Sequence, residues 1–380
     1  MKHKLHDLIY DPNVGNHYDS ANQPLYYSST YHQDTLNGQS DYDYARSGNP
    51  NRKHLESKLA KLENATYALA FNAGISAINA LFLSFKAGDH FILPDDVYGG
   101  TYRLTQDILT RFNLSFTTVD QIDLSAIERA IQPNTKLIYI ETPSNPLFKV
   151  TDIKAITSLA QSHDILTAVD NTFMTPLGQS PLALGADVVI HSATKFLGGH
   201  SDMIAGALMT NDKALHQDLY NVQNGTGSAL SVYDCWVLSQ HLKTFPLRFQ
   251  QSVQHAEKVI AFLKSHPSVA HVYYPGNDSV HQQQASTNGA VFGFRLKHED
   301  AYQTFVDHLS IPIVAVSLGG VETILSHPFT MSHASIPEPV RIARGITKGL
   351  FRLSVGLEDP DILIEDLNQA LNEVTDDDVT

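Results

Sequence analysis

The sequence predicts an α/β protein in which a mostly parallel β-sheet, covered by helices, precedes a smaller α+β region. Short apolar runs alternate with amphipathic segments from about residue 52 to residue 245, a pattern typical of parallel sheets with crossover helices. Residues 247–265 then have helical character, and the remainder is richer in antiparallel signals such as GAVFGFRL. At 380 residues the chain exceeds one core of usual size, so more than one domain is expected.

Residues 1–57 are polar and rich in tyrosine, and they predict an extended N-terminal arm rather than a packed unit. A disordered tail is the alternative. The aromatic stretch NQPLYYSSTY and the turn sequence SGNP argue against it. Helical periodicity begins in HLESKLAKLE, where Leu55, Leu59 and Leu62 share one face.

Five apolar runs predict the strands of the large sheet, at 67–71, 90–94, 136–141, 165–170 and 187–192. Helices are expected between several of them, at 75–85 and 124–131 for example. We therefore divide the chain into an arm, a large unit and a C-terminal unit, at residues 1–57, 58–245 and 246–380.

Composition excludes several classes of function. The formal charge of −14 argues against nucleic acid as a partner, because binding to phosphates needs clustered Lys and Arg. No run approaches the length of about 18 apolar residues that predicts a membrane span, and the N-terminus has no apolar signal segment. A single cysteine, Cys235, fits a cytoplasmic location. No HExxH or CxxC pattern accompanies the 19 histidines, so no metal site is expected.

Polar residues follow three of the predicted strands: Glu141, Asp170 and the pair His191–Ser192. In parallel sheets the crevice beyond the carboxyl ends of the strands binds the ligand. Asp170 and Lys195 are therefore expected to face one ligand from neighbouring strands. Each has an ordinary alternative: Lys195 alone is more often a surface lysine, and Asp170 alone is more often a helix cap.

A helix start at Asn72–Ala73–Gly74 offers free N–H groups and the positive end of a dipole, which suit a phosphate. A single glycine there is weak evidence, since it also occurs in ordinary strand–helix turns. A lysine, a carboxylate behind a ring nitrogen and a phosphate cradle are together what pyridoxal 5′-phosphate (PLP) requires. The combination predicts a PLP site.

The two stretches AVDNTF (168–173) and SATKFLGGHSD (192–202) resemble the lysine signature of the Cys/Met-metabolism family of PLP-dependent enzymes, which includes cystathionine γ-lyases, γ-synthases and β-lyases. The resemblance implies the aspartate aminotransferase-like fold (fold type I), and it extends from about residue 24 to the end. Further blocks occur in family order: YARSGNPNR (44–52), AFNAGISAI (70–78), DVYGGTYR (96–103), ETPSNP (141–146), SLGGVET (317–323), HASIP (333–337) and FRLSVGLED (351–359).

The resemblance implies a role for each matching residue. Lys195 is the catalytic lysine that bonds covalently to the cofactor, Asp170 faces the pyridine nitrogen, and Tyr98 stacks on the ring and takes part in catalysis. The phosphate is held by backbone N–H groups and hydroxyls of Gly74, Ile75, Ser192 and Thr194.

The arm supplies Tyr44 and Arg46, which reach the phosphate from a neighbouring subunit. The family therefore implies a homo-oligomer, expected as a tetramer built from two dimers. The carboxylate of a small amino-acid substrate is held by Arg352, Asn145 and Ser317.

One departure from the family pattern bears on the reaction. Members that act at Cγ usually carry a glutamate just before the serine, where this chain has Val316. Asp43, beside Tyr44, is the candidate for supplying that charge to the substrate. Leu318 differs from the tryptophan of enteric β-lyases. We expect a cystathionine γ-lyase with appreciable β-elimination; β-lyase and γ-synthase are the alternatives.

Two features are expected to be structural. His200, Ser201 and Asp202 are adjacent, whereas members of a catalytic triad converge from separate parts of a fold. Cys235 is expected on a buried helix as a small apolar residue. A non-catalytic regulator on the same scaffold would need a DNA-binding appendage, and this chain has neither a basic patch nor the spare length for one. A binding or structural protein on the scaffold would lack the yellow colour of a PLP enzyme.

Overall fold

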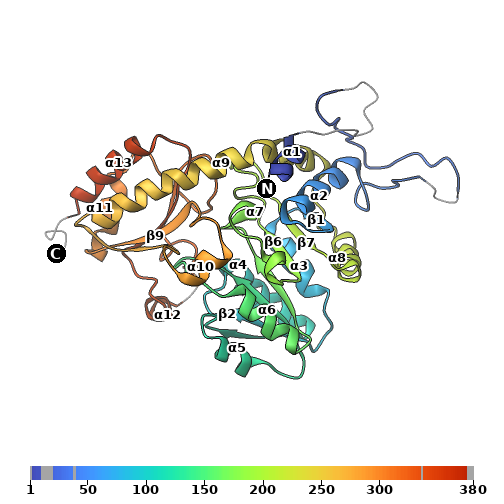
Figure 1. Ribbon diagram of the computed structural model, residues 1–380, viewed down its shortest axis with the longest axis horizontal. Helices are drawn as coiled ribbons and strands as arrows, with labels where there is room; N and C mark the ends of the chain where they lie inside the picture. Colours follow the sequence, from blue (N-terminus) through green and yellow to red (C-terminus); the bar gives the residue numbers. More distant parts are fainter. Residues whose placement is uncertain (1, 10–19, 37–39, 335–336, 375–380) are drawn as a thin grey trace.

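The computed structural model describes residues 2–9, 20–36, 40–334 and 337–374. Two β-sheets lie side by side along the long axis of the molecule, and one long helix runs past both (Figure 1). The expected class, a mostly parallel sheet followed by a smaller α+β unit, is confirmed. Within the described part of the chain, no helix combines the length and apolar character needed to cross a membrane.

The large sheet has the strand order β1-β7-β6-β5-β4-β2-β3. Only β7 runs against its neighbours; the other adjacent pairs in the order are parallel. Its strands are β1 (Tyr67–Phe71), β2 (His90–Pro94), β3 (Ser115–Val119), β4 (Thr135–Glu141), β5 (Leu166–Asp170), β6 (Val188–His191) and β7 (Gly206–Thr210).

The five expected strands are present, and the sequence analysis missed two. The edge strand β3 has the sequence SFTTV and is partly exposed, so it lacks the apolar run that marks a buried strand. β7 is fully buried, but its sequence GALMT combines small residues with weak strand preference. Its tight packing needs the glycine, because a Cβ on Gly206 would lie 2.2 Å from the Ala73 carbonyl oxygen.

Alternate residues of the central strands pack on opposite faces of this sheet. Val188 and Ile190 of β6 contact the layer that contains α3 and α8, whereas Val189 faces the layer that contains α2 and α9. The helices α5 and α6 extend this second layer. Because both faces are covered, the strands read as continuous apolar runs.

The helices of the large unit are α2 (Pro50–Glu63), α3 (Gly74–Leu83), α4 (Gly99–Arg103), α5 (Leu124–Ala130), α6 (Ile153–Ser162), α7 (Thr175–Gly178) and α8 (Lys213–Thr226), with short turns of other helix types at Leu104–Ile108, Leu109–Phe112 and Pro181–Leu184. Near the N-terminus, α1 spans Lys2–Ile9. The helix expected from HLESKLAKLE begins earlier, because Pro50 suits a first turn and the Asn49 side chain caps it.

The small sheet has the order β10-β11-β12-β9-β8 and is antiparallel except for the pair β10–β11. Its strands are β8 (Val269–Tyr273), β9 (Val291–Leu296), β10 (Ile313–Val314), β11 (Ile324–Ser326) and β12 (Leu350–Ser354). The helices of this part are α10 (Ser279–Gln284), α11 (Tyr302–Asp307), α12 (Glu338–Ala343) and α13 (Pro360–Asn372), with a 3₁₀ turn at Glu299–Ala301.

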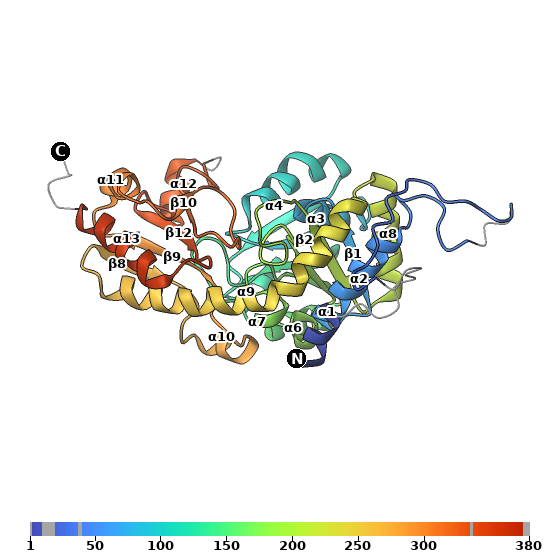
Figure 2. The same cartoon turned by 90° about the horizontal axis from the view of Figure 1, so that it is seen from above.

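The helix α9 spans Val232–Ser265 and includes Pro246. It is longer than the stretch expected at 247–265, and the expected division at residues 245 and 246 falls inside it. Figure 2 shows α9 running along both sheets. Its buried Cys, Leu, Phe, Val, Ala and Ile side chains belong to one apolar cluster that also contains residues of α2, β9, β12 and α13.

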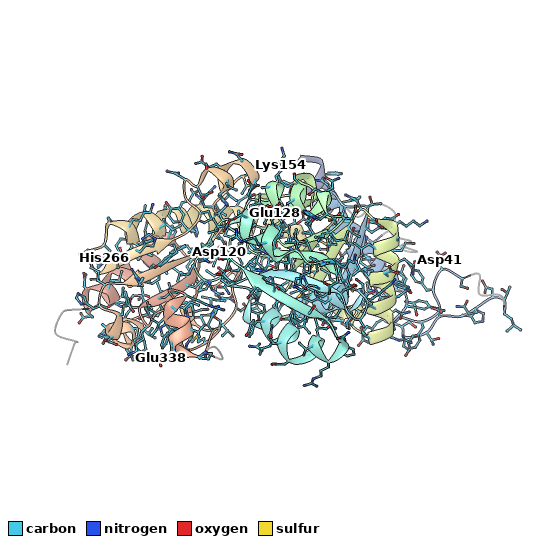
Figure 3. The ribbon with its side chains drawn as sticks, turned by 90° about the horizontal axis from the view of Figure 1, so that it is seen from below. Asp41, Asp120, Glu128, Lys154, His266 and Glu338 are labelled. Atoms are coloured by element: carbon cyan, nitrogen blue, oxygen red, sulfur yellow. The ribbon has the colours of Figure 1, made fainter. Side chains whose placement is uncertain are left out.

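Residues 20–36 and 40–49 form turns and loops that extend beyond the body of the molecule (Figure 1), whereas α1, which also lies in the expected arm, packs on the body through the buried Leu8. In Figure 3, Asp41 lies at the opposite end of the molecule from His266 and Glu338. Thr30 and Tyr44 form an isolated antiparallel bridge within this segment. Residues 10–19 and 37–39 of the expected arm lie outside the described residues.

Candidate active site between the two sheets

Lys195 lies in a tight turn that follows β6. The N–H of Gly199 donates to the Lys195 carbonyl oxygen at 2.7 Å. Gly199 has a φ of +74°, and a Cβ there would lie 1.7 Å from the Arg248 guanidinium, so the turn requires glycine. The Lys195 Nζ donates to the Ser317 Oγ at 2.6 Å, which joins the large sheet to a loop of the small one.

The environment of Lys195 raises the fraction of its amine that is unprotonated. Burial, together with the positive charge of Arg352, lowers the pKa of Lys195 to about 8. A much larger fraction of this amine is therefore unprotonated at neutral pH than of an ordinary lysine. An unprotonated amine is the form that attacks a carbonyl carbon.

Arg352 is buried on β12 at 5% exposure. Its Nη1 donates to the Asn145 Oδ1 at 3.0 Å, and its Nη2 donates to the Ser317 carbonyl oxygen at 2.7 Å and to the Ser326 Oγ at 3.1 Å. The Nε is buried without a partner. Burial lowers the pKa of Arg352 to about 10, which still leaves the group cationic at neutral pH. The structure thus brings Arg352, Asn145, Ser317 and Lys195 together, with a cation and an unused donor suited to a carboxylate.

Asp170 ends β5, which pairs with β6, and β6 leads to the turn that contains Lys195. Its Oδ1 accepts from the Thr172 N–H at 3.0 Å, and its Oδ2 accepts from the Tyr139 hydroxyl at 3.3 Å. The Thr172 hydroxyl oxygen in turn accepts from the Ser192 N–H at 2.8 Å. Asp170 and Ser192 are therefore connected through one threonine.

The helix α3 begins at Gly74 against the same turn. A Cβ on Gly74 would lie 2.8 Å from the Ser192 Cβ, so a larger residue does not fit without a shift. The N–H groups of Gly74 and Ile75 belong to the first turn, where no earlier helical carbonyl can accept them. The start of α3 thus lies against Ser192. The role of these groups at a phosphate stays a prediction.

Thr194, another expected phosphate ligand, has its hydroxyl engaged elsewhere in this structure. Its Oγ1 donates to the Ala205 carbonyl oxygen at 3.1 Å and accepts from the Ala205 N–H at 3.0 Å. The role of Thr194 at a phosphate stays a prediction.

Tyr98 immediately precedes α4, and its side chain is 46% exposed. Its backbone N–H donates to the Glu141 Oε2 at 2.9 Å. The sequence analysis noted Glu141 only as a polar residue at a strand end. The contact between the two residues was not predictable from the sequence, because 43 positions separate them.

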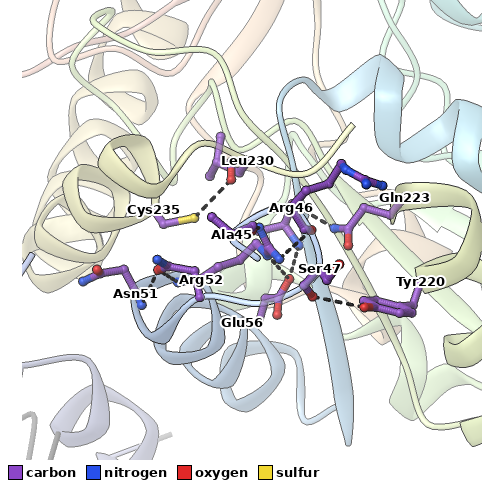
Figure 4. A network of polar contacts seen from close by, with 12 residues as sticks. Ala45, Arg46, Ser47, Asn51, Arg52, Glu56, Tyr220, Gln223, Leu230 and Cys235 are labelled. Atoms are coloured by element: carbon purple, nitrogen blue, oxygen red, sulfur yellow. Dashed lines mark hydrogen bonds and ion pairs between the residues drawn. The ribbon is translucent and has the colours of Figure 1, made fainter. Parts of the chain in front are cut away.

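The expected arm ligands Tyr44 and Arg46 are exposed in this chain. In the part of the chain that the structure describes, the hydrogen bonds of Arg46 go to Asn224, at 2.8 and 3.2 Å, and not to the lysine turn. Figure 4 shows the base of the arm, where the Arg52 guanidinium donates to the carbonyl oxygens of Ala45 and Arg46 at 2.7 and 2.9 Å.

The two residues expected to decide substrate preference lie on the surface. Val316 is 62% exposed beside Ser317. Asp43 is exposed on the arm, where its Oδ1 accepts from the Tyr44 N–H at 2.6 Å. Their roles toward a substrate stay predictions.

Sequence reasoning missed a buried pair behind the site. The Glu63 Oε1 accepts from the His191 Nε2 at 2.6 Å and from the Asn171 Nδ2 at 2.9 Å, and all three side chains are buried. Asn171 directly follows Asp170, and His191 directly precedes Ser192. One carboxylate at the end of α2 thus contacts the segments that carry both residues.

The tandem His200, Ser201 and Asp202 forms no relay. The His200 Nδ1 contacts the Gly198 carbonyl oxygen, Ser201 donates to Glu322, and Asp202 pairs with His241. Cys235 is buried in α9, where burial raises the pKa of its thiol. Across the described ranges, no group of three His, Cys, Asp or Glu residues is arranged to hold a metal ion.

Comparison with known proteins gives concordant matches over nearly the whole chain. Residues 9–372 match the model of the "Cys/Met metabolism PLP-dependent enzyme" family. Cystathionine beta-lyase MetC of Staphylococcus haemolyticus is 65% identical over 97% of this chain and 94% of its own length. Cystathionine gamma-lyase of Bacillus subtilis is 45% identical over 92% of this chain and 94% of its own length. The crystal structure of cystathionine gamma-lyase from Lactobacillus plantarum, complexed with L-serine, superimposes with a TM-score of 0.93 at 43% identity, covering 98% of this chain and 99% of that one.

Proposed function

The chain belongs to the Cys/Met-metabolism family of PLP-dependent enzymes and is a carbon–sulfur lyase, and on this premise we propose that it cleaves L-cystathionine at the Cβ–S bond to give homocysteine, pyruvate and ammonia. The observation that carries the proposal is the convergence of Lys195 and Arg352 around Ser317. A reactive amine and a carboxylate-binding cation at one point suit an amino-acid substrate.

The residues present fit PLP. The close approach of Gly74 to Ser192 leaves a cradle that a side chain at position 74 would fill, and N–H groups at a helix start suit a phosphate dianion. Asp170 offers a carboxylate to a protonated ring nitrogen, and Lys195 offers the amine that bonds to the cofactor. When bound, PLP supplies an electron-accepting ring that stabilises negative charge at the substrate Cα.

The protein groups then have separate tasks. Arg352 and Asn145 hold the substrate α-carboxylate, which orients the Cα–H bond toward Lys195. The Lys195 Nζ, poised by its lowered pKa, accepts the Cα proton. The Tyr98 hydroxyl donates a proton to the departing sulfur. The Ser317 hydroxyl accepts from the Lys195 amine, and the Ser317 carbonyl oxygen accepts from Arg352. Ser317 therefore couples the two groups.

The proposal that the Cβ–S bond is cleaved, rather than the Cγ–S bond, rests on the 65% identical relative that is named a beta-lyase. Cleavage at Cγ, to cysteine, 2-oxobutanoate and ammonia, is the second candidate. The block pattern of the sequence and the relatives named gamma-lyases favour it. In support of Cβ, Val316 presents no charge beside Ser317. Asp43 does not discriminate between the two cleavages, because a contact from a neighbouring subunit to the distal ammonium of cystathionine would serve both.

The test is the identity of the keto acid. Purified protein is incubated with L-cystathionine, cysteine, homocysteine and O-acylated homoserine, and the products are separated by chromatography. Pyruvate is expected to dominate with cystathionine. Mainly 2-oxobutanoate would replace the proposal with the γ-lyase, and cystathionine formed from O-acylated homoserine and cysteine would replace it with the γ-synthase. Lys195→Ala must abolish turnover in every case.

The oligomer is part of the proposal. The extension of the arm beyond the body supports a role for Tyr44 and Arg46 in a neighbouring subunit, within a tetramer in the cytoplasm. Subunit mixing tests this: Arg46→Ala and Lys195→Ala proteins are each expected to be inactive, and co-refolding is expected to restore activity, because a mixed dimer contains one intact site. No recovery, in assemblies shown to be mixed, would contradict the crossing of the arm.

A further inference from the structure

Glu141 is a buried carboxyl group that the proposed reaction does not use. It ends β4 and pairs in register with Asp170, which ends β5. Residues in register on neighbouring parallel strands point to the same face of a sheet. Two carboxyl groups therefore lie side by side at the edge of the sheet that faces the site.

The two oxygens of Glu141 have different surroundings. The Oε2 accepts from the Tyr98 N–H at 2.9 Å, whereas the Oε1 is buried without a partner, and the residue is only 8% exposed. Tyr98 is the residue that α4 presents to the cofactor in the proposed function. The hydrogen bond fixes its backbone at the point where α4 begins.

The groups that face Glu141 are acidic or neutral. Burial, followed by the charges of Asp170 and Asp96, raises the pKa of Glu141 well above its usual range, and it outweighs the hydrogen bonds from the Tyr98 N–H and the Tyr139 side chain, which lower that pKa. Among the described residues, no Lys, Arg or His forms an ion pair with it. A buried anion with an unpartnered oxygen and two anionic neighbours is unfavourable, whereas a neutral acid is not.

We propose that Glu141 is held as an uncharged carboxylic acid and is a positioning residue: its Oε2 anchors the backbone of Tyr98, and its neutrality leaves Asp170 free to carry the negative charge opposite the cofactor ring. This inference rests on the proposed function for the roles of Tyr98 and Asp170. The assignment of a neutral state to Glu141 stands on the packing of the two carboxyl groups.

Infrared difference spectroscopy on the cofactor-loaded protein tests the charge state directly. The carbonyl stretch of a neutral carboxylic acid is separate from the bands of carboxylates. We expect such a band at pH 7 in the wild type and its loss in Glu141→Gln. Glu128→Gln, at an exposed position on α5, is the matched control and is expected to keep the band. Burial raises the pKa of Glu56 to about 7, so Glu56 also contributes a band at this pH. The Glu141 band is therefore read from the spectrum of the wild type minus that of Glu141→Gln, and its absence from that difference would overturn the inference.

Kinetics test the positioning role. Glu141→Leu removes the acceptor of the Tyr98 N–H, which no longer fixes the backbone where α4 begins, so kcat/KM is expected to fall by about fivefold or more. Glu141→Gln keeps a neutral acceptor for the Tyr98 N–H, so its kcat/KM is expected to stay close to that of the wild type. The pH profile of kcat/KM is expected to be the same as in the wild type. Equal losses in the two variants, at equal cofactor content, would refute the role.

The outcomes separate this inference from the proposed function. The infrared band does not depend on which substrate is cleaved. If the band is found but cystathionine is not a substrate, only the proposed function fails. If cystathionine is cleaved and the band is absent, only the inference fails.

Discussion

Replacing Glu63 by alanine tests how much the buried pair behind the site contributes to stability. The substitution removes the acceptor of two buried donors, the His191 Nε2 at 2.6 Å and the Asn171 Nδ2 at 2.9 Å. A buried donor left without an acceptor costs about 1–3 kcal/mol, so for the two donors together we expect a loss of about 3–5 kcal/mol. Glu63→Gln keeps one acceptor oxygen of similar position, and we expect it to cost less than half as much.

The assay is urea unfolding of the cofactor-loaded protein, followed by far-UV circular dichroism. With an m-value of about 3 kcal/mol per molar, the expected loss lowers the midpoint by roughly 1–1.7 M in Glu63→Ala. Glu257→Ala removes an exposed glutamate of α9 and is the matched control, with an expected change within about 0.5 kcal/mol. A loss below about 1 kcal/mol in Glu63→Ala would refute the reasoning, since two stranded donors cost more than that.

Three further predictions concern the site. Arg352→Lys loses the forked donor set and is expected to raise KM by roughly 10- to 100-fold with cofactor retained; steady-state kinetics measure this, and an unchanged KM would contradict the carboxylate role. In cofactor-free protein the amine of Lys195, whose pKa is lowered to about 8, becomes reactive as pH rises through that value. The rate of PLP recombination, plotted against pH, is therefore expected to have its midpoint near 8 rather than near the ordinary lysine value of 10.5. Stopped-flow absorbance measures this rate. Gly74→Ala places a methyl group 2.8 Å from the Ser192 Cβ and is expected to weaken PLP binding about tenfold or more; equal affinity in an equilibrium titration would show that the cradle is not at this turn.

The parts of the fold that were predictable are those with a local signal. The strands β1, β2, β4, β5 and β6 are buried on both faces and appear as apolar runs. The edge strand β3 and the small-residue strand β7 lack that signal, so only their pairing in the sheet defines them. The helix α9 continues through Pro246, where the sequence pattern suggested a division.

The residues of the candidate site also fall into those with a local sequence signal and those without one. Lys195, Asp170 and Gly74 lie next to strand ends or a helix start, so sequence order placed them in one site. The contacts of Glu63 and Glu141 were invisible to that reasoning, because their partners are 128 and 43 positions away. Whether Tyr44 and Arg46 reach the site of a neighbouring chain, as proposed, likewise depends on an assembly and not on local sequence.

The long helix has a consequence for how the protein can be dissected. At a rise of about 1.5 Å per residue, α9 is a rod of roughly 50 Å that lies against both sheets. A cut between residues 245 and 246 would leave Leu242 and Phe245 on one fragment and Phe249 and Val253 on the other, each half exposing an apolar stripe that now lies in a single cluster. Neither half is expected to be stable without its complement, so split versions for fragment complementation should be opened elsewhere, at exposed turns such as the one before α8.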